Sequence, residues 1–205
     1  NGLGAIIENS PAKAALTRKI EDATDEYQRA ITRYLIALSE RDLTSNESEQ
    51  IPTLLHSVND VERVGDMAQN LAETADFLMT RKFVFSPQAV KNLEDMGALV
   101  DNMFTPLMKA VGEGKPEFAL EVLALEKKVN AMCRQCDEEH LDRMRTGICL
   151  LPSATCFTDA MHFLEKIGDH LKNVAQTAHN MFTYSRGKAH LPKESGEDKV
   201  GNLSL

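Results

Sequence analysis

The chain has 205 residues, of which 42% are hydrophobic and 26% charged, a composition typical of a soluble globular protein. Its formal net charge of -8 argues against nucleic acid as a partner, because binding to a phosphate backbone requires a basic surface. No apolar run approaches the roughly 18 residues of a membrane-spanning helix, and no signal-peptide pattern opens the chain.

Capping residues and prolines divide the chain into five expected helices. Ser10-Pro11 and Ser86-Pro87 each place a capping hydroxyl before a proline, a pattern typical of a helix start. The predicted helices span residues 11–41, 49–81, 86–111, 116–145 and 154–184. Residues 186–205 are polar, with Gly, Pro and mixed charge, and predict a disordered tail. The chain is therefore predicted to be all-α, an antiparallel helical bundle.

One motif occurs twice, at an offset of 103 residues. VERVGDMAQNLA at residues 61–72 matches LEKIGDHLKNVA at residues 164–175, with the Glu, Gly, Asp and Asn positions and the last Ala identical. The helix that precedes each copy matches as well. An internal repeat of this kind indicates that the bundle consists of two similar halves.

In the first half, acidic residues on two successive helices are expected to meet. Glu21 and Asp25 precede Glu62 and Asp66, and each pair has the i, i+4 spacing that keeps both side chains on one helix face. In an antiparallel hairpin, every pair of residues at the same height on the two helices has the same mean residue number, or midpoint, which falls in the connecting loop. Glu21 with Asp66 and Asp25 with Glu62 both have theirs between residues 43 and 44, inside the expected loop at 42–48. We therefore expect one cluster of four carboxylates.

The second half repeats this arrangement with one change. Glu126 and Asn130 precede Glu165 and Asp169, so an amide replaces one acid. Glu126 with Asp169 and Asn130 with Glu165 share a midpoint between residues 147 and 148, in the segment before the fifth helix. A second cluster, one charge weaker, is therefore expected.

Clustered carboxylates repel one another unless a cation neutralises them. Oxygen-rich clusters suit Mg, Ca, Mn or iron, and carboxylates in a bundle core can hold paired metals. The alternative is ion pairing with basic side chains of the neighbouring helix turns. The candidates are Arg18, Arg63, Lys128 and Lys166. The residues alone leave both interpretations open.

Other polar and small residues of the motif favour structural roles. Gly65 and Gly168 occupy equivalent positions inside helices and predict the close approach of a neighbouring helix. Asn70 and Asn173 are expected to bridge helices by hydrogen bonds rather than to bind metal. His170 adjoins Asp169 and is the one histidine that merits a test as a ligand.

The cysteines are expected to be buried or idle thiols. Cys133 and Cys136 form one C-x-x-C, but a zinc site usually needs a second such pair and none follows. Cys149 and Cys156 complete the set of four. His162 is expected to be a surface or hydrogen-bonded histidine.

These motifs resemble the PhoU family. ERVGD in the first half and EKIGD in the second are similar to the family's paired E(D)-x-x-x-D signatures, and the likeness covers roughly residues 12–185. HLDRMRTGICLL at 140–151 and CFTDAMHFLEKIGDHLKNVA at 156–175 resemble more closely the cytoplasmic C-terminal domain of bacterial Na+/phosphate cotransporter family proteins.

The resemblance implies two PhoU-type repeats and a metal site in each. The first repeat would span residues 1–81, with its leading helix short or missing, and the second residues 86–185. The implied cofactor is multinuclear iron or another divalent metal. The positions that match the family motif are Glu21, Asp25, Glu62, Asp66, Glu126, Asn130, Glu165 and Asp169.

The function implied by the resemblance is regulatory and non-enzymatic: a domain at the cytoplasmic face of the cell membrane that modulates phosphate uptake or signalling. Its expected partner is a transmembrane transporter domain of the same chain or a phosphate-system protein, and a homodimer is a further expectation. The chain begins at Asn1 rather than Met, so we expect a fragment of a longer protein.

Two other functions remain open at this stage. One is a structural helical adaptor whose carboxylates are salt-bridged. The other is a di-metal carboxylate enzyme, a class that uses Glu-x-x-His on two helices. The chain offers only Asp137-x-x-His140, without a counterpart in the first half, which disfavours the enzyme.

Overall fold

The computed structural model describes residues 1–145 and 151–185, and within these ranges it contains helices and no strands. The tail at 186–205, Cys149 and the midpoint between 147 and 148 lie outside the described residues. The elements are α1 (Gly2–Ile7), α2 (Pro11–Ser39), α3 (Ser45–Arg81), α4 (Pro87–Gly112), the 3-10 helix η1 (Pro116–Phe118), α5 (Ala119–Arg145) and α6 (Leu151–Ser185). The all-α prediction is confirmed. None of the described helices combines the length and apolarity needed to cross a bilayer.

The predicted caps of α2 and α4 are confirmed. Ser10 Oγ accepts a hydrogen bond from the backbone N–H of Lys13 at 3.3 Å, and Ser86 Oγ accepts one from Ala89 at 3.2 Å. In both helices the following proline occupies the first turn, where its missing N–H costs nothing.

Several helix boundaries differ from the predicted ones by two to four residues. α3 starts at Ser45, four residues before the expected start, because Thr44 and Glu47 form a capping box. α6 starts at Leu151 rather than at 154, and α2 ends at Ser39 rather than at 41. The sequence analysis missed α1, whose six residues are too few to show a helical period.

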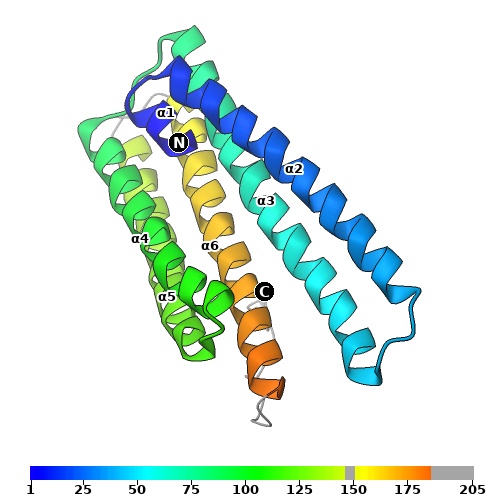
Figure 1. Cartoon of the computed structure of the whole chain (residues 1–205). Helices are drawn as coiled ribbons and strands as arrows, with labels where there is room; N and C mark the ends of the chain where they lie inside the picture. The colour runs from blue at the N-terminus through cyan, green and yellow to red at the C-terminus, as the bar shows by residue number, and fades with distance from the viewer. Residues whose placement is uncertain (146–150, 186–205) are drawn as a thin grey trace, which may run out of the picture.

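Two helical hairpins, α2–α3 and α5–α6, form the frame of the molecule. α3 packs against α6, α4 packs against both α5 and α6, and α1 lies mainly against α3. Figure 1 shows α6 between the α4–α5 pair on one side and the α2–α3 pair on the other. The 26-residue α4 precedes the second hairpin, whereas the six-residue α1 precedes the first.

One continuous apolar core joins the two hairpins. Phe157, Met161 and Leu164 of α6 are at most 3% exposed and belong to the same cluster as buried residues of α3, α4 and α5. α2 contributes Ala14 to this core, and its Tyr27 is 70% exposed. The core of the bundle is thus centred on α6, and the outer face of α2 is exposed to solvent.

Candidate functional site

The first cluster of predicted site residues lies between α2 and α3. Glu21 and Asp25 on α2, and Glu62 and Asp66 on α3, are all partly buried. Burial raises the pKa of Glu21, and the neighbouring carboxylates, those of Asp25, Asp66 and Glu62 among them, raise it further. Burial also raises the pKa of Glu62, and Asp66 and Asp25 add to the shift. The four carboxylates thus lie near enough for their charges to interact, as the sequence predicts, although no three of them have ligand oxygens within 4.8 Å of one another.

Little positive charge offsets the first cluster. Arg29 pairs with Asp25 at 3.3 Å, but its side chain is 60% exposed, where an ion pair contributes little. Arg63 and His170 act on Glu62 and lower its pKa without reversing the net rise. A cluster of carboxylates in this state suits a cation, with oxygen ligands of the kind that hard divalent metals prefer.

The second cluster lies at the equivalent place between α5 and α6, and lysines neutralise it. Glu126 is 3% exposed and accepts hydrogen bonds from Lys172 Nζ at 2.8 Å and from Asn130 Nδ2 at 2.7 Å. Lys166 Nζ lies 3.1 Å from both Glu165 and Asp169. The structure therefore assembles all four predicted residues, but their charge is already paired. Of the cations predicted as partners, Lys166 fills this role.

The two clusters differ in the residue type at one equivalent position. Lys172 of the second copy aligns with Gln69 of the first. Burial lowers the pKa of Lys172, but its contacts with Glu126 and Asp169 raise it more, so the net shift is upward and the ammonium stays charged. Gln69 instead donates to Glu73 at 3.4 Å within its own helix. The first cluster consequently has no counterpart of the Lys172 charge at this position.

The two motif glycines face the partner helix of their own hairpin, as predicted, but differ in how closely it approaches. A Cβ at Gly168 would lie 3.2 Å from Val129 Cγ1, tighter than ordinary contact. A Cβ at Gly65 would lie 3.6 Å from Thr24 Cγ2 and 3.7 Å from Glu21 Cγ, which is ordinary van der Waals contact. Of the two motif glycines, only Gly168 thus lies closer to the partner helix than ordinary van der Waals contact would allow for a Cβ.

A polar bridge joins the two hairpins. Asp60 Oδ1 on α3 accepts from Asn173 Nδ2 at 3.1 Å and lies 2.8 Å from His170 Nδ1. The side chains of Asp60 and His170 are each only 17% exposed. The bridging role predicted for Asn173 is confirmed, and His170 is engaged by a carboxylate of the other hairpin rather than by its neighbour Asp169.

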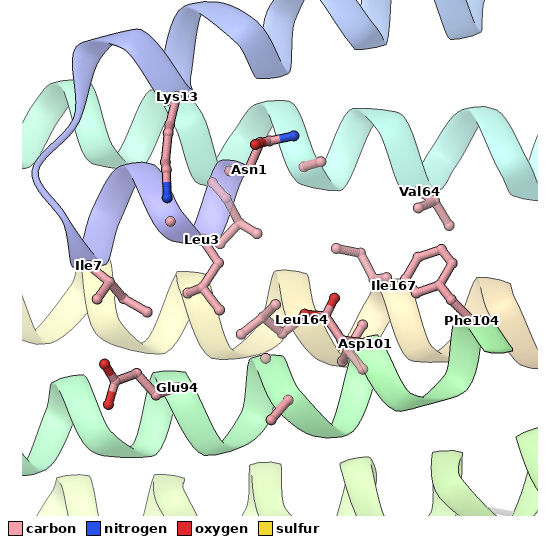
Figure 2. Close-up of a pocket in the computed structure, with 17 residues that line it drawn as sticks. Asn1, Leu3, Ile7, Lys13, Val64, Glu94, Asp101, Phe104, Leu164 and Ile167 are labelled. Atoms are coloured by element: carbon pink, nitrogen blue, oxygen red, sulfur yellow. The ribbon is translucent and has the colours of Figure 1, made fainter.

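An apolar cavity of about 490 Å³ lies between α1, α3, α4 and α6, and none of the residues of the two clusters lines it. Figure 2 shows Leu3, Val64 and Ile167 along its wall, with Glu94 and Asp101 on α4 as its acidic side chains. Lys13, at one edge, pairs with Glu8. Apolar walls and two carboxylates do not suit phosphate, which favours convergent N–H donors or free cations.

Two functional contacts escaped the sequence analysis. Lys172 lies one turn beyond Asp169, at i+3, so its reach to the second cluster could have been found from helix spacing alone. Asp60 carried no such signal, because its partners are 110 and 113 residues away on the other hairpin. Among the predicted cations, Arg18 pairs with Asp76 instead of the first cluster.

Comparison with known proteins identifies a family model and several relatives that match this chain. A family model described as the PhoU domain matches residues 3–75 and 93–178. The phosphate-specific transport system accessory protein PhoU homolog 1 of Thermotoga maritima is 27% identical, over 84% of this chain and 78% of that protein. The corresponding PhoU homologue of Pseudomonas aeruginosa is 25% identical, over 86% of this chain and 72% of its own length.

A solved structure has the same fold. The crystal structure of PhoU from Pseudomonas aeruginosa superposes with a TM-score of 0.82 at 24% identity, covering 91% of this chain and 88% of that one. The relatives are named as accessory proteins rather than as enzymes, which bears out the expectation of a non-enzymatic role. From its matched repeats and its helical bundle, the chain belongs to the PhoU family.

Proposed function

We propose that the chain is a regulatory PhoU-type domain that modulates phosphate uptake or signalling, acting at the cytoplasmic face of the membrane on a sodium-dependent phosphate cotransporter. The names of the relatives, accessory proteins of a phosphate-specific transport system, support a phosphate-system partner. The likeness of residues 140–151 and 156–175 to the cytoplasmic domain of cotransporter family proteins supports that particular transporter. The transporter domain belongs to the same chain or to a separate protein in this proposal.

The observation that carries the proposal is the weak charge compensation of the first cluster. Glu21, Asp25, Glu62 and Asp66 offer carboxylate oxygens from two helices, and their mutual repulsion raises the pKa of Glu21 and of Glu62 after burial has done so. We propose that these four residues hold a divalent metal, with multinuclear iron as the leading candidate. The bound ion would neutralise the cluster and fix α2 against α3, so that metal or phosphate state alters the surface offered to the transporter.

The second cluster does not fit a metal in the same way. Lys172 and Lys166 already supply positive charge to Glu126, Glu165 and Asp169, so an incoming ion would have to displace both lysines. This arrangement favours the salt-bridged adaptor role for the second repeat. The metal role of Asn130 and of the three acids remains a prediction from the family motif.

Elemental analysis tests the metal half of the proposal. The purified chain is compared with a Glu62→Gln/Asp66→Asn variant and with a matched Glu165→Gln/Asp169→Asn variant. We expect iron, manganese or nickel in stoichiometric amount, lost in the first variant and kept in the second. Absence of metal after loading, with a melting temperature that chelation does not change, would leave the chain as a structural adaptor.

Uptake of labelled phosphate tests the regulatory half. Cells that lack the chain are complemented with the wild type or with the Glu62→Gln/Asp66→Asn variant, with and without sodium in the medium. We expect altered sodium-dependent uptake in the deletion and rescue by the wild type alone. Uptake that is unaffected by the deletion at both low and high phosphate would contradict the proposal. The homodimer remains a prediction, for which sedimentation is the direct measurement.

A further inference from the structure

Three residues with metal-binding side chains meet between α5 and α6, next to the second cluster. A ligand atom of Cys133, one of Asp137 and one of His162 all lie within 4.8 Å of one another. Asp137 Oδ2 is 3.5 Å from His162 Nε2. Cys133 and Asp137 are one turn apart on α5 and share a face, while His162 reaches them from α6.

The hairpin register explains why these residues meet. Cys133 and His162 have the same midpoint as Asn130 and Glu165, so they form the next level of the same antiparallel pairing. Asp137 lies one turn further along the same face of α5. The trio is therefore a direct consequence of the register that assembles the carboxylate clusters.

The first repeat shows what this level looks like without metal-binding residues. With Glu21 set against Glu126 and Glu62 against Glu165, the equivalents of Cys133 and His162 are Gln28 and Asn59. Gln28 Nε2 donates to Asn59 Oδ1 at 3.0 Å, a neutral bridge between α2 and α3. Thr32 stands in the place of Asp137. All three positions thus carry metal-binding side chains in one repeat and neutral polar ones in the other.

The side chains around the trio do not satisfy the carboxylate of Asp137. Within the described part of the chain, Asp137 Oδ1 is buried and has no hydrogen-bond partner, an arrangement that costs free energy unless a partner is supplied. Cys133 is 5% exposed, and burial, followed by the charges of Asp137 and Glu165, raises the pKa of its thiol to about 12. Lys166 opposes this shift, but it is held by Glu165 and Asp169.

We propose that Cys133, Asp137 and His162 form a binding site for a thiophilic divalent transition metal of the zinc class. Thiolate, imidazole and carboxylate are the three ligand types that zinc takes in proteins, at roughly 2.0–2.3 Å. The side chain of His162 is 51% exposed, which gives its ring the freedom to close on an ion. Water, or Glu165 one turn along α6, completes the coordination.

This site is independent of the metal proposed for the first cluster. It differs in ligand chemistry, since that cluster offers only oxygen, and it lies in the other repeat. The bound ion would tie α5 to α6 beside a cluster whose own charges are already paired. The competing interpretation is a partly exposed Asp137–His162 ion pair next to an inert buried thiol.

Cobalt substitution distinguishes the two interpretations. The full chain, reduced and freed of metal, is titrated with Co²⁺ alone, and thiolate-to-cobalt charge-transfer absorption is followed in the near ultraviolet. We expect the band to saturate at one equivalent and to disappear when Zn²⁺ is added. Cys133→Ser should abolish it. His162→Gln, a change at an exposed position, should weaken cobalt binding by more than about tenfold, the loss that even an outer-shell change causes at metal sites.

Matched variants make the result specific. Cys136→Ser removes a buried thiol one turn away, and His56→Gln removes an exposed histidine on α3, so neither should change the band. No thiolate band in the wild type, a band that survives Cys133→Ser, or an affinity unchanged by His162→Gln would each overturn the proposal. Glu62→Gln/Asp66→Asn should keep the band whether or not the first cluster binds metal, which separates failure of this site from failure of the proposed function.

Discussion

The two carboxylate clusters occupy equivalent places in the two repeats, yet they handle the same electrostatic problem differently. In the second repeat, Lys172 reaches the buried Glu126, and a cation of the chain itself supplies the charge. In the first repeat, Gln69 stands at that position and the acids Glu21 and Glu62 remain unneutralised, with raised pKa values. The residue at this position thus accounts for the cation that Glu126 has and Glu21 lacks, while Lys166 adds further positive charge to the second cluster.

The acidic residues of the two clusters also differ in how deeply they are buried. Glu126 is 3% exposed, and a carboxylate so deeply buried requires a permanent partner. Glu21 and Glu62 are only partly buried, so solvent screens their repulsion enough for the cluster to exist without a fixed cation. The comparison indicates a structural second repeat and a first repeat whose charge state can respond to its surroundings.

The largest effect is expected from Lys172→Gln, which gives the second cluster the residue of the first. The substitution leaves Glu126 buried without its cation, and breaking a buried pair by removing one partner costs about 3 kcal/mol of unfolding free energy. Urea titration measures this loss. Lys166→Gln is the matched control: its side chain is 53% exposed, so it should lose less than about 1 kcal/mol. Equal losses in the two variants would show that Lys172 is not special.

The reciprocal change, Gln69→Lys, should convert the first cluster to the second type. A lysine at this position has the reach that Lys172 shows toward Glu126, and it would compete with a metal for Glu21. We expect metal affinity to fall by at least tenfold, about 1.4 kcal/mol. Isothermal titration with the metal found by elemental analysis gives the value. Gln69→Met, of similar length and uncharged, should keep the affinity, and a loss of the same size in both variants would rule out the charge as the cause.

Much of this comparison was accessible from the sequence. The repeat, the i, i+4 columns and the hairpin midpoints predicted that Glu21, Asp25, Glu62 and Asp66 would meet, because helix periodicity and antiparallel register are local rules. The same midpoint rule would have placed Cys133 opposite His162. The sequence could not place Asp60 beside His170, because that contact depends on how α3 packs on α6, and ridge-and-groove packing has no short sequence signature.

A smaller effect should come from the motif glycines. Gly65→Ala adds a methyl group at ordinary contact distance from Thr24 and removes the flexibility of glycine, so it should stabilise the protein by up to about 1 kcal/mol. Gly168→Ala places the methyl group 3.2 Å from Val129 Cγ1, and Val129 is fully buried and β-branched, so it has little room to move. Thermal unfolding should therefore rank Gly65→Ala above wild type and Gly168→Ala below Gly65→Ala. The reverse order would place the tight helix contact in the first repeat.

The smallest effect concerns the pH dependence of the metal-free protein. The pKa values of Glu21 and Glu62 in the folded chain lie above 4.5, the ordinary value, so in the window between 4.5 and the raised values the folded chain binds more protons than the unfolded chain. The stabilisation that these extra bound protons give the folded chain is fully present below the window and is lost as the pH rises through it. Glu21→Gln removes one of these groups and lessens the repulsion on the other, so the decline should become shallower. Glu26→Gln, an exposed change on α2, should leave the slope as it is.

Saturating metal should remove or invert this decline in the wild type, because a bound divalent ion favours the ionised carboxylates. A slope unchanged by metal would indicate that the first cluster, like the second, is internally compensated.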